Sequence, residues 1–419
     1  MAKLIPSISI IGFEDACEAI RGAVRPVSSE RIPLTDALGR FAAEDIVADA
    51  DLIPFDRSSM DGFAVFSGDT RAASPEHPVV FRVTQSVFAE RGHSILTPET
   101  AMAISTGAPI PRGADAVIPI EDVQENNGTI LVSAPVTPRC CIFPAGEDTR
   151  RGELLVLRGQ MIRPATLGLL AFIGKASLTV YRRPRVSVTC TGSELIAAGA
   201  TPSHGEIRNS NGLTLTTLVK ECGGEATDFG IVADDRQALK TFLESAGSDC
   251  DMIITTGGAS AGQRDLIKGV LQQLGVDFRF QAVAVRPGKP TGFGVWHGMP
   301  VFALPGNPAA AFVSFHVLIR PALLHVAGCH CQSISVVRAV LNGHARSKPG
   351  FRYFLLARLA STGQAFEVTP LLNQCSVLAR TAADANSLIE LPEGNSIFTN
   401  GEIVKVRVLD WTSVLPSDG

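Results

Sequence analysis

The stretch "DMIITTGGASAGQRD", Asp251–Asp265, combines a short β-branched run with a glycine-rich loop. The residues that follow, "DLIKGVLQQLG", have the apolar spacing of a helix. A strand that leads through glycines into a helix is typical of α/β proteins with a parallel sheet. In such sheets, ligands bind beyond the carboxyl ends of the strands. The stretch therefore predicts an α/β domain with a binding site at Gly257 and Gly258.

Neighbouring segments repeat this pattern and extend the predicted sheet. Strand-like runs end in unusual loops at four places, which we expect at one edge of the sheet: Thr189–Leu195, Thr255–Asp265, Val285–Pro290 and Leu304–Ala310. Glycines in these loops let backbone N–H groups approach an anion closely. Arg286 and Lys289 add positive charge at the same edge. No Walker A loop is present, so phosphate binding by a different route is indicated.

Carboxylates accompany these loops. Glu194 follows the first loop, Asp234 follows a later strand, and Asp265 closes the glycine loop. Bare carboxylates would repel a phosphate, whereas Mg²⁺ bridging acid and phosphate oxygens would make the arrangement favourable. Helix N-capping is the alternative for Asp234 or Asp235.

The rest of the chain is rich in β-prone segments. An early helix is predicted at Phe13–Val24, and the runs from 27 to 136 predict a β-rich module with a hairpin at "NNGT". A second helix is predicted from Pro164, and β-prone runs return from Cys329 to the end. "GCHC" at this last boundary has no second Cys/His pair at zinc spacing, which indicates a junction.

Composition excludes several classes of protein. The 419 residues exceed what one core usually organises, and 45% hydrophobic with 19% charged residues is typical of a folded, soluble chain. A net charge of -4 gives no indication of nucleic-acid binding. Nine scattered cysteines favour a reducing compartment, and the apolar run Pro164–Gly174 is too short to span a membrane. We expect a cytoplasmic protein.

Seven motifs together resemble one known family. They are "PFDRSSMDGFAV", "STGAPIPRGADAVIPIED", "GEDTRRGE", "TCTGSEL", "TTGGASAGQRD", "RPGKP" and "LPGNP". Their order and spacing are similar to those of the molybdopterin molybdenumtransferase family, which includes the bacterial molybdenum-insertion enzyme and the C-terminal domain of gephyrin. The resemblance runs from about residue 10 to 410.

The resemblance implies an architecture and a reaction. It implies an elongated multi-domain subunit with a central parallel α/β molybdopterin-binding domain, a β-rich lobe and a C-terminal β-barrel-like domain. The predicted domains are 10–50 with 145–180 (linker domain), 51–144 (β-rich), 181–328 (α/β) and 329–412 (C-terminal β). It also implies a Mg²⁺-dependent insertion of molybdate into adenylylated molybdopterin, with release of AMP, in a homodimer whose subunits share the active site. Transient contacts with the molybdopterin adenylyltransferase and with acceptor apoenzymes are expected.

The resemblance also carries over individual residues. The implied catalytic residues are Asp61, Thr106, Asp148, Glu194, Asp234 and Asp265, of which Asp61, Glu194 and Asp265 are expected at the metal. The implied substrate-binding residues are Gly257, Gly258, Ser260, Arg286, Lys289, Pro305, Gly306, Asn307 and Ser376.

Some positions depart from the family pattern. Ala282 and Arg286 stand where lysines are frequent, Leu356 stands in place of an arginine, and Cys375 replaces a glycine. Arg352 or Arg358 could substitute for the arginine. Two alternatives therefore stay open: a catalytically weakened paralogue that acts as a cofactor-binding or scaffold protein, and a molybdopterin adenylyltransferase.

Overall fold

The computed structural model describes residues 10–87, 94–233, 235–247, 249–257, 266–330, 335–371, 379–394 and 396–414. The chain forms two compact units. The first consists of Met1–Glu44, Arg158–Arg163 and Ser177–Gly419, and the second of Asp45–Leu157 and Pro164–Ala176. The division into four domains stays a prediction.

A six-stranded sheet forms the centre of the first unit. Its strand order is β16 (Glu225–Val232), β13 (Arg185–Thr191), β17 (Met252–Thr256), β21 (Met299–Leu304), β20 (Gly292–Trp296) and β18 (Asp277–Phe280). The first four strands are parallel, as predicted. The last two are antiparallel to their neighbours, which the prediction of a parallel sheet missed. A tight turn at His297 and Gly298 joins β20 to β21, and both residues have positive φ. Two-residue turns with positive φ are favoured in hairpins because their twist matches that of the two strands.

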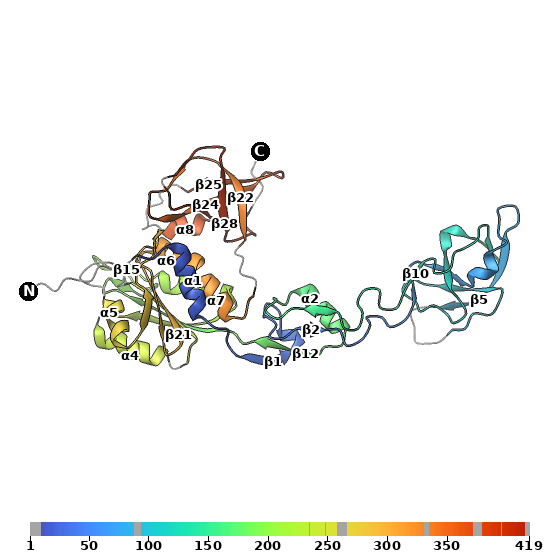
Figure 1. Ribbon diagram of the computed structural model, residues 1–419, viewed down its shortest axis with the longest axis horizontal. Helices are drawn as coiled ribbons and strands as arrows, with labels where there is room; N and C mark the ends of the chain where they lie inside the picture. The colour runs from blue at the N-terminus through green and yellow to red at the C-terminus, as the bar shows by residue number, and fades with distance from the viewer. Residues whose placement is uncertain are drawn as a thin grey trace, which may run out of the picture. The chain divides into compact units, whose positions relative to one another are not determined.

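Helices pack on both faces of this sheet (Figure 1). One core cluster contains Ile254 of β17 with residues of α1 (Phe13–Ala23), α3 (Asn211–Glu221), α6 (Pro308–Ser314) and α7 (Arg320–Val326). The other contains Ile253 with residues of α4 (Arg236–Ala246) and α5 (Leu266–Gln273). Adjacent strand residues point to opposite faces, so a continuous apolar run is what a sheet covered on both sides requires.

The segment Pro308–Val326 is a long apolar helical stretch in the described part of the chain. It is 19 residues long, and by length and composition it could cross a membrane. However, 72% of it is buried inside the first unit. The apolar character of this helix is therefore explained by its place in the core. Sequence reasoning considered only the shorter apolar run Pro164–Gly174 as a possible membrane span and did not consider Pro308–Val326.

A closed five-stranded barrel forms the C-terminal part of the first unit. Its strands are β24 (Arg352–Ser361), β25 (Phe366–Pro370), β22 (Val336–Leu341), β28 (Ile403–Val408) and β26 (Ser387–Leu391), and β26 pairs back with β24. The short strand β19 (Val285–Arg286) pairs with β24. The loop Val285–Pro290 therefore does not follow a strand of the central sheet, and the prediction of four loops at one sheet edge is wrong for this one.

Ion pairs and aromatic rings join the barrel to α1. Arg352 of β24 bonds Glu14 of α1 and also contacts Glu390 of β26 at 3.4 Å. The ring centroids of Phe13 and Phe354 lie 5.2 Å apart. Barrel and α/β core therefore share a buried contact within one unit.

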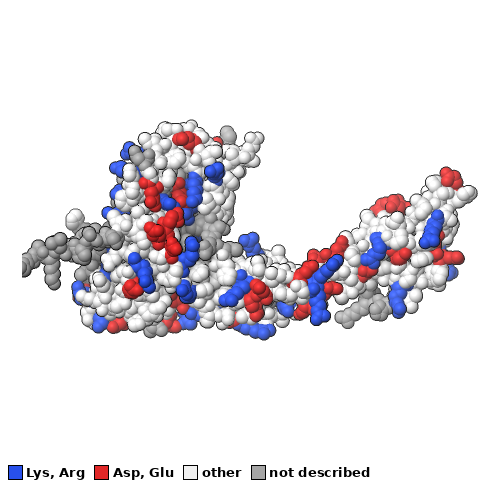
Figure 2. Space-filling view, in the orientation of Figure 1, with Lys and Arg blue, Asp and Glu red and all other residues white. Residues whose placement is uncertain are grey.

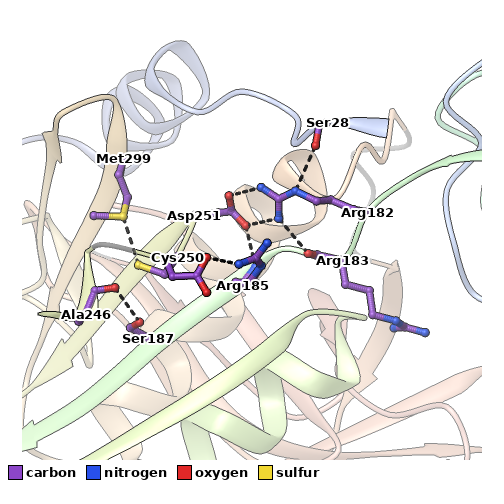
Figure 3. A network of polar contacts seen from close by, with 10 residues as sticks. Ser28, Arg182, Arg183, Arg185, Ser187, Ala246, Cys250, Asp251 and Met299 are labelled. Atoms are coloured by element: carbon purple, nitrogen blue, oxygen red, sulfur yellow. Dashed lines mark hydrogen bonds and ion pairs between the residues drawn. The ribbon is translucent and has the colours of Figure 1, made fainter. Parts of the chain in front are cut away.

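A second polar network lies at the amino ends of the central strands (Figure 3). Asp251, just before β17, accepts from Arg182 Nη1 at 2.6 Å and from the Arg185 backbone N–H at 2.8 Å. Arg182 Nε also donates to Ser28 Oγ at 3.2 Å. This network is at the opposite end of the strands from the glycine loops, so it stabilises the fold at a distance from the predicted site.

The second unit contains another six-stranded sheet. Its order is β7 (Ala116–Pro119), β4 (Gly62–Val65), β6 (Thr100–Ile104), β5 (Val79–Val87), β9 (Thr129–Val132) and β8 (Gln124–Asn126). Asn127 and Gly128 join β8 to β9, both with positive φ, which confirms the hairpin predicted at "NNGT". The remaining elements are β2 (Ile46–Val47), β3 (Arg57–Ser58), β10 (Ile142–Phe143), β11 (Leu154–Val156) and α2 (Pro164–Phe172).

The predicted fold class is confirmed: a multi-domain chain with α/β and β-rich domains and a barrel near its C-terminus. The helix predicted at Phe13–Val24 and the helix predicted from Pro164 are both present, as α1 and α2. On the face shown in Figure 2, positive and negative side chains are interspersed over both units.

Candidate functional site

Three parallel strands end together in the first unit. Gly192 follows β13, Gly257 follows β17, and Gly306 follows β21. A Cβ on Gly257 would lie 2.0 Å from the carbonyl oxygen of Thr191, and a Cβ on Gly306 would lie 3.2 Å from Cα of Gly257. Gly257 also has φ +100°, a conformation that other residues rarely adopt. The strand ends can therefore meet only because these residues are glycines.

Polar side chains line these strand ends. Asn211 Nδ2, in the first turn of α3, donates to Thr256 Oγ1 at 3.0 Å and to the Gly306 carbonyl at 2.9 Å. Thr256 Oγ1 donates to the Pro305 carbonyl at 2.9 Å. Within the described residues, the buried Thr191 Oγ1 has no hydrogen-bond partner. We call Thr191, Gly192, Asn211, Thr256, Gly257, Pro305 and Gly306 the strand-end site.

Two cations, Arg286 at the end of β19 and Lys289 on the turn that follows it, lie against one aromatic ring. Both cations are exposed. Arg286 Cζ is 4.6 Å, and Lys289 Nζ 5.9 Å, from the ring centroid of Phe351, just before β24. The turn also contacts α6, because a Cβ on Gly288 would lie 2.5 Å from Ser314 Oγ. The barrel thus supplies a ring that holds both positive charges by cation–π attraction.

The structure describes the positions of Glu194, Asp235 and Asn307. Glu194 is exposed, and its carboxylate oxygens lie 2.8 Å from where a Cβ on Gly192 would be. Asp235 accepts from the Ala238 backbone N–H at 2.9 Å and caps α4, as the capping alternative predicted. Asn307 caps α6 in the same way at 3.3 Å from Ala310 N, which gives it a structural role.

The donor set is compatible with Mg²⁺ held jointly by protein and substrate. No group of three or more His, Cys, Asp or Glu residues gathers among the described residues. Magnesium is usually bound through one or two carboxylates and substrate phosphates, so a single exposed carboxylate such as Glu194 fits this mode.

Asp61 is the best-defined carboxylate of the second unit. Its Oδ1 accepts from the Thr106 backbone N–H at 2.7 Å and from Thr106 Oγ1 at 3.0 Å. These two hydrogen bonds lower the pKa of Asp61, so it is a carboxylate at neutral pH. Asp61 also lines a groove of about 400 Å³ together with Phe63, Ser105 and Glu125.

The other acidic residues of this unit differ from Asp61. Asp56 forms an ion pair with Arg139 and accepts from the Ala145 backbone N–H at 2.9 Å, which ties two loops together. Asp148 is exposed. The structure therefore brings Asp61 and Thr106 together, and Asp56 has a structural role.

The structure does not describe every predicted residue. Asp234, Gly258, Ser260, Asp265, Ser376 and Cys375 lie outside the described residues. A cavity of about 660 Å³ between α1, α7 and β22 is lined by none of the predicted site residues.

Sequence reasoning missed Asn211 and Phe351, and it included Thr191 and Thr256 only as members of predicted loops. A signal for Asn211 existed, since a polar "NSN" run directly precedes a helix that follows a predicted loop. Phe351 gave no signal, because its role depends on pairing between β19 and β24.

The departures from the family pattern have clear structural positions. Leu356 is 3% exposed and belongs to the core shared by barrel and α/β domain. Arg352 is engaged with Glu14 and Glu390, and Arg358 reaches the Asp384 carbonyl at 3.5 Å. The suggestion that Arg352 replaces the missing arginine is therefore not supported by its contacts.

Three family models match successive parts of the chain. The MoeA N-terminal region (domain I and II) matches residues 11–174, a probable molybdopterin binding domain matches 187–325, and the MoeA C-terminal region (domain IV) matches 338–409. Together they cover most of the described chain.

Named relatives are similar over nearly their whole length. A Mycobacterium tuberculosis protein named molybdopterin molybdenumtransferase 2 is 38% identical over 379 residues, which is 88% of this chain and 92% of that protein. A Staphylococcus aureus molybdopterin molybdenumtransferase is 32% identical over 393 residues, 93% and 94% of the two chains. A crystal structure of a molybdopterin biosynthesis MoeA protein from a Pyrococcus species has a TM-score of 0.82 at 34% identity and covers 96% of this chain and 100% of its own.

Proposed function

Because the chain belongs to the molybdopterin molybdenumtransferase family, we propose that it inserts molybdenum from molybdate into adenylylated molybdopterin and releases AMP. The observation that carries this proposal is the strand-end site, where glycine backbone and an unpartnered Thr191 hydroxyl meet in the part of the chain that matches a probable molybdopterin binding domain. Such an edge suits a polar ring system that carries a phosphate.

Binding of the anions follows from the charges near this edge. Molybdate and the adenylate phosphates are all negative, so their approach needs fixed positive charge. Arg286 and Lys289, exposed on one turn, supply it. Mg²⁺ would be held by Glu194 and by the predicted ligands Asp265 and Asp61, and when bound it would neutralise charge on the phosphates.

We also propose that the active site is shared between two subunits. Asp61 of the partner subunit would approach the strand-end site, with its carboxylate oriented by Thr106. Two hydrogen bonds from Thr106 hold Oδ1 of Asp61 and so fix the direction in which Oδ2 points. A carboxylate that binds a metal ion or substrate benefits from being oriented before the ligand arrives. We further propose a cytoplasmic location. Transient contacts with the molybdopterin adenylyltransferase, which supplies the substrate, and with acceptor apoenzymes, which take up the product, complete the proposal.

The test is a reconstituted insertion assay with the full chain. Adenylylated molybdopterin, molybdate and Mg²⁺ are supplied, and AMP release is measured together with activation of a molybdenum-dependent apoenzyme. The proposal predicts AMP release that depends on molybdate, and loss of turnover in Asp265→Asn. Unchanged activity in that variant would remove Asp265 from the site.

One observation favours the weakened paralogue as a second candidate. Leu356 is buried in the core shared by the barrel and the α/β domain. The family has an arginine at this position, so this chain lacks one positive charge next to the α/β domain. Tight binding of adenylylated molybdopterin without AMP release would support this candidate. Incorporation of AMP from ATP into molybdopterin would instead support an adenylyltransferase.

A further inference from the structure

Three sulfur atoms are joined by two contacts on the second unit, and one of them belongs to Met60, the residue before Asp61. Cys140 Sγ and Cys141 Sγ are 3.7 Å apart, and Cys141 Sγ is 3.9 Å from Met60 Sδ. Neither thiol is part of a disulfide. None of these residues has a role in the proposed insertion reaction.

The backbone brings the two neighbouring thiols to one side. In extended chain, adjacent side chains point in opposite directions. Cys141 instead has φ +52° and Arg139 has φ +69°, left-handed conformations that a non-glycine residue rarely adopts. Hydrogen bonds of 3.0 Å from Ser59 N to the Cys141 carbonyl, and of 3.0 Å from Val117 N to the Cys140 carbonyl, hold this conformation.

Two of the three sulfur–sulfur distances match a metal with three sulfur ligands. With metal–sulfur bonds of about 2.3 Å, three ligands in a plane are separated by roughly 4 Å. The sulfur–sulfur distances of 3.7 and 3.9 Å are close to this value before any metal is bound. Cys141 Sγ is therefore at a suitable separation from both other sulfurs, and binding of one ion by all three requires Cys140 Sγ and Met60 Sδ to reach the same separation from each other.

The ligand types decide which ion fits. Soft sulfur ligands bind Cu(I) and also Zn²⁺, but the usual zinc ligands are Cys, His and carboxylates, so the thioether of Met60 favours Cu(I). We propose that Cys140, Cys141 and Met60 form a Cu(I) site. Among the described residues no three His, Cys, Asp or Glu side chains gather at one point, and the third ligand proposed here is a methionine.

The binding step is balanced without a redox partner. The two thiols release their protons to water, their sulfur lone pairs and that of Met60 form bonds to one Cu⁺, and copper keeps its oxidation state. Met60 is 42% exposed and both cysteines are half-buried, so an ion can enter from solvent. The inference is independent of the proposed insertion activity.

The experiment is an anaerobic transfer of Cu(I) from its bicinchoninate complex to the reduced full chain, followed by the absorbance of the chelator complex. We expect one equivalent of tightly bound Cu(I), with sulfur neighbours at about 2.3 Å by X-ray absorption. Cys141→Ser should weaken binding by at least about 100-fold, since even outer partners of metal ligands contribute up to that much. Met60→Leu, an exposed and conservative change, should reduce the sulfur count by one and also weaken binding.

A matched control tests whether a single cysteine beside a methionine is enough to bind Cu(I). Cys250 Sγ lies 3.3 Å from Met299 Sδ in the first unit (Figure 3), but no second thiol of the described residues is recorded in contact with that pair. Cys250→Ser should leave the Cu(I) capacity unchanged. The proposal is overturned if Cu(I) stays with the chelator, if Met60→Leu and Cys141→Ser bind like the native chain, or if Zn²⁺ binds as tightly as Cu(I). Unfolding midpoints of each variant exclude loss of fold as the cause.

Discussion

At the scale of single residues, Asp56 and Asp61 show how neighbouring carboxylates acquire different roles. Asp56 is used by an ion pair with Arg139, whereas both described hydrogen bonds to Asp61 come from Thr106. We predict that Asp61→Asn abolishes molybdate-dependent AMP release. Asp56→Asn should lower the free energy of unfolding by about 1 kcal/mol or less and keep the activity, because exposed ion pairs contribute little. Equal loss of activity in both variants would contradict this distinction.

The lowered pKa of Asp61 also predicts a pH dependence. Hydrogen bonds from the Thr106 N–H and hydroxyl favour the carboxylate, so the pKa is lower in the folded than in the unfolded chain. The stability that these bonds add is therefore fully present above the unfolded pKa and is lost as the pH falls through the folded pKa. Urea midpoints of the native chain and Asp61→Asn should differ at neutral pH and converge in acid. A difference that grows on acidification would have the wrong sign.

Phe351 provides the other prediction at this scale, and it depends on the proposed function. The ring lies against both Arg286 and Lys289, and each exposed cation–π contact is worth about 0.5–1 kcal/mol. Phe351→Leu should therefore raise the KM for molybdate by roughly fivefold with little change in kcat. Phe351→Tyr keeps the ring and should restore the KM. A fall in kcat alone would indicate a different role.

At the scale of elements, the close approach of three strand ends depends on Gly257. A Cβ there would lie 2.0 Å from the Thr191 carbonyl, so Gly257→Ala must separate β13 from β17. We expect a loss of at least about 1–3 kcal/mol in unfolding free energy and loss of ligand binding, measured by urea denaturation and calorimetry. Gly269→Ala in α5 is the matched control, since nothing lies within 4 Å of its added Cβ. The control should be neutral or stabilising, because alanine favours helix.

Elements with strong local signals were predicted correctly. The 3.6-residue spacing of Phe13, Ala16 and Ile20 predicted α1, and Asp235 predicted the start of α4. The strand β19 was assigned to the wrong sheet, because two residues before a proline carry no information about their partner. Asn211 and Phe351 were missed for the same physical reason: their contacts join segments that are far apart in the sequence.

At the scale of the whole molecule, the predicted site residues fall into two separate groups. Asp61, Thr106 and Asp148 belong to the second unit, whereas Glu194, Gly257 and Lys289 belong to the first. A homodimer with two-fold symmetry would bring the second unit of one subunit to the first unit of its partner, and both sites would then be equivalent. We therefore predict that the residues of the second unit act in the active site of the partner subunit and not in that of their own subunit.

Complementation between inactive variants tests this directly. Asp61→Asn changes only the second unit and Lys289→Ala only the first, so each homodimer should be inactive. In a co-expressed mixture, half of the dimers contain both variants, and a shared site leaves each of these with one unaltered active site. Recovery of roughly a quarter of the native AMP release is expected for such a two-fold dimer. If each site were built within one subunit, every site in the mixture would carry one substitution and no activity would return.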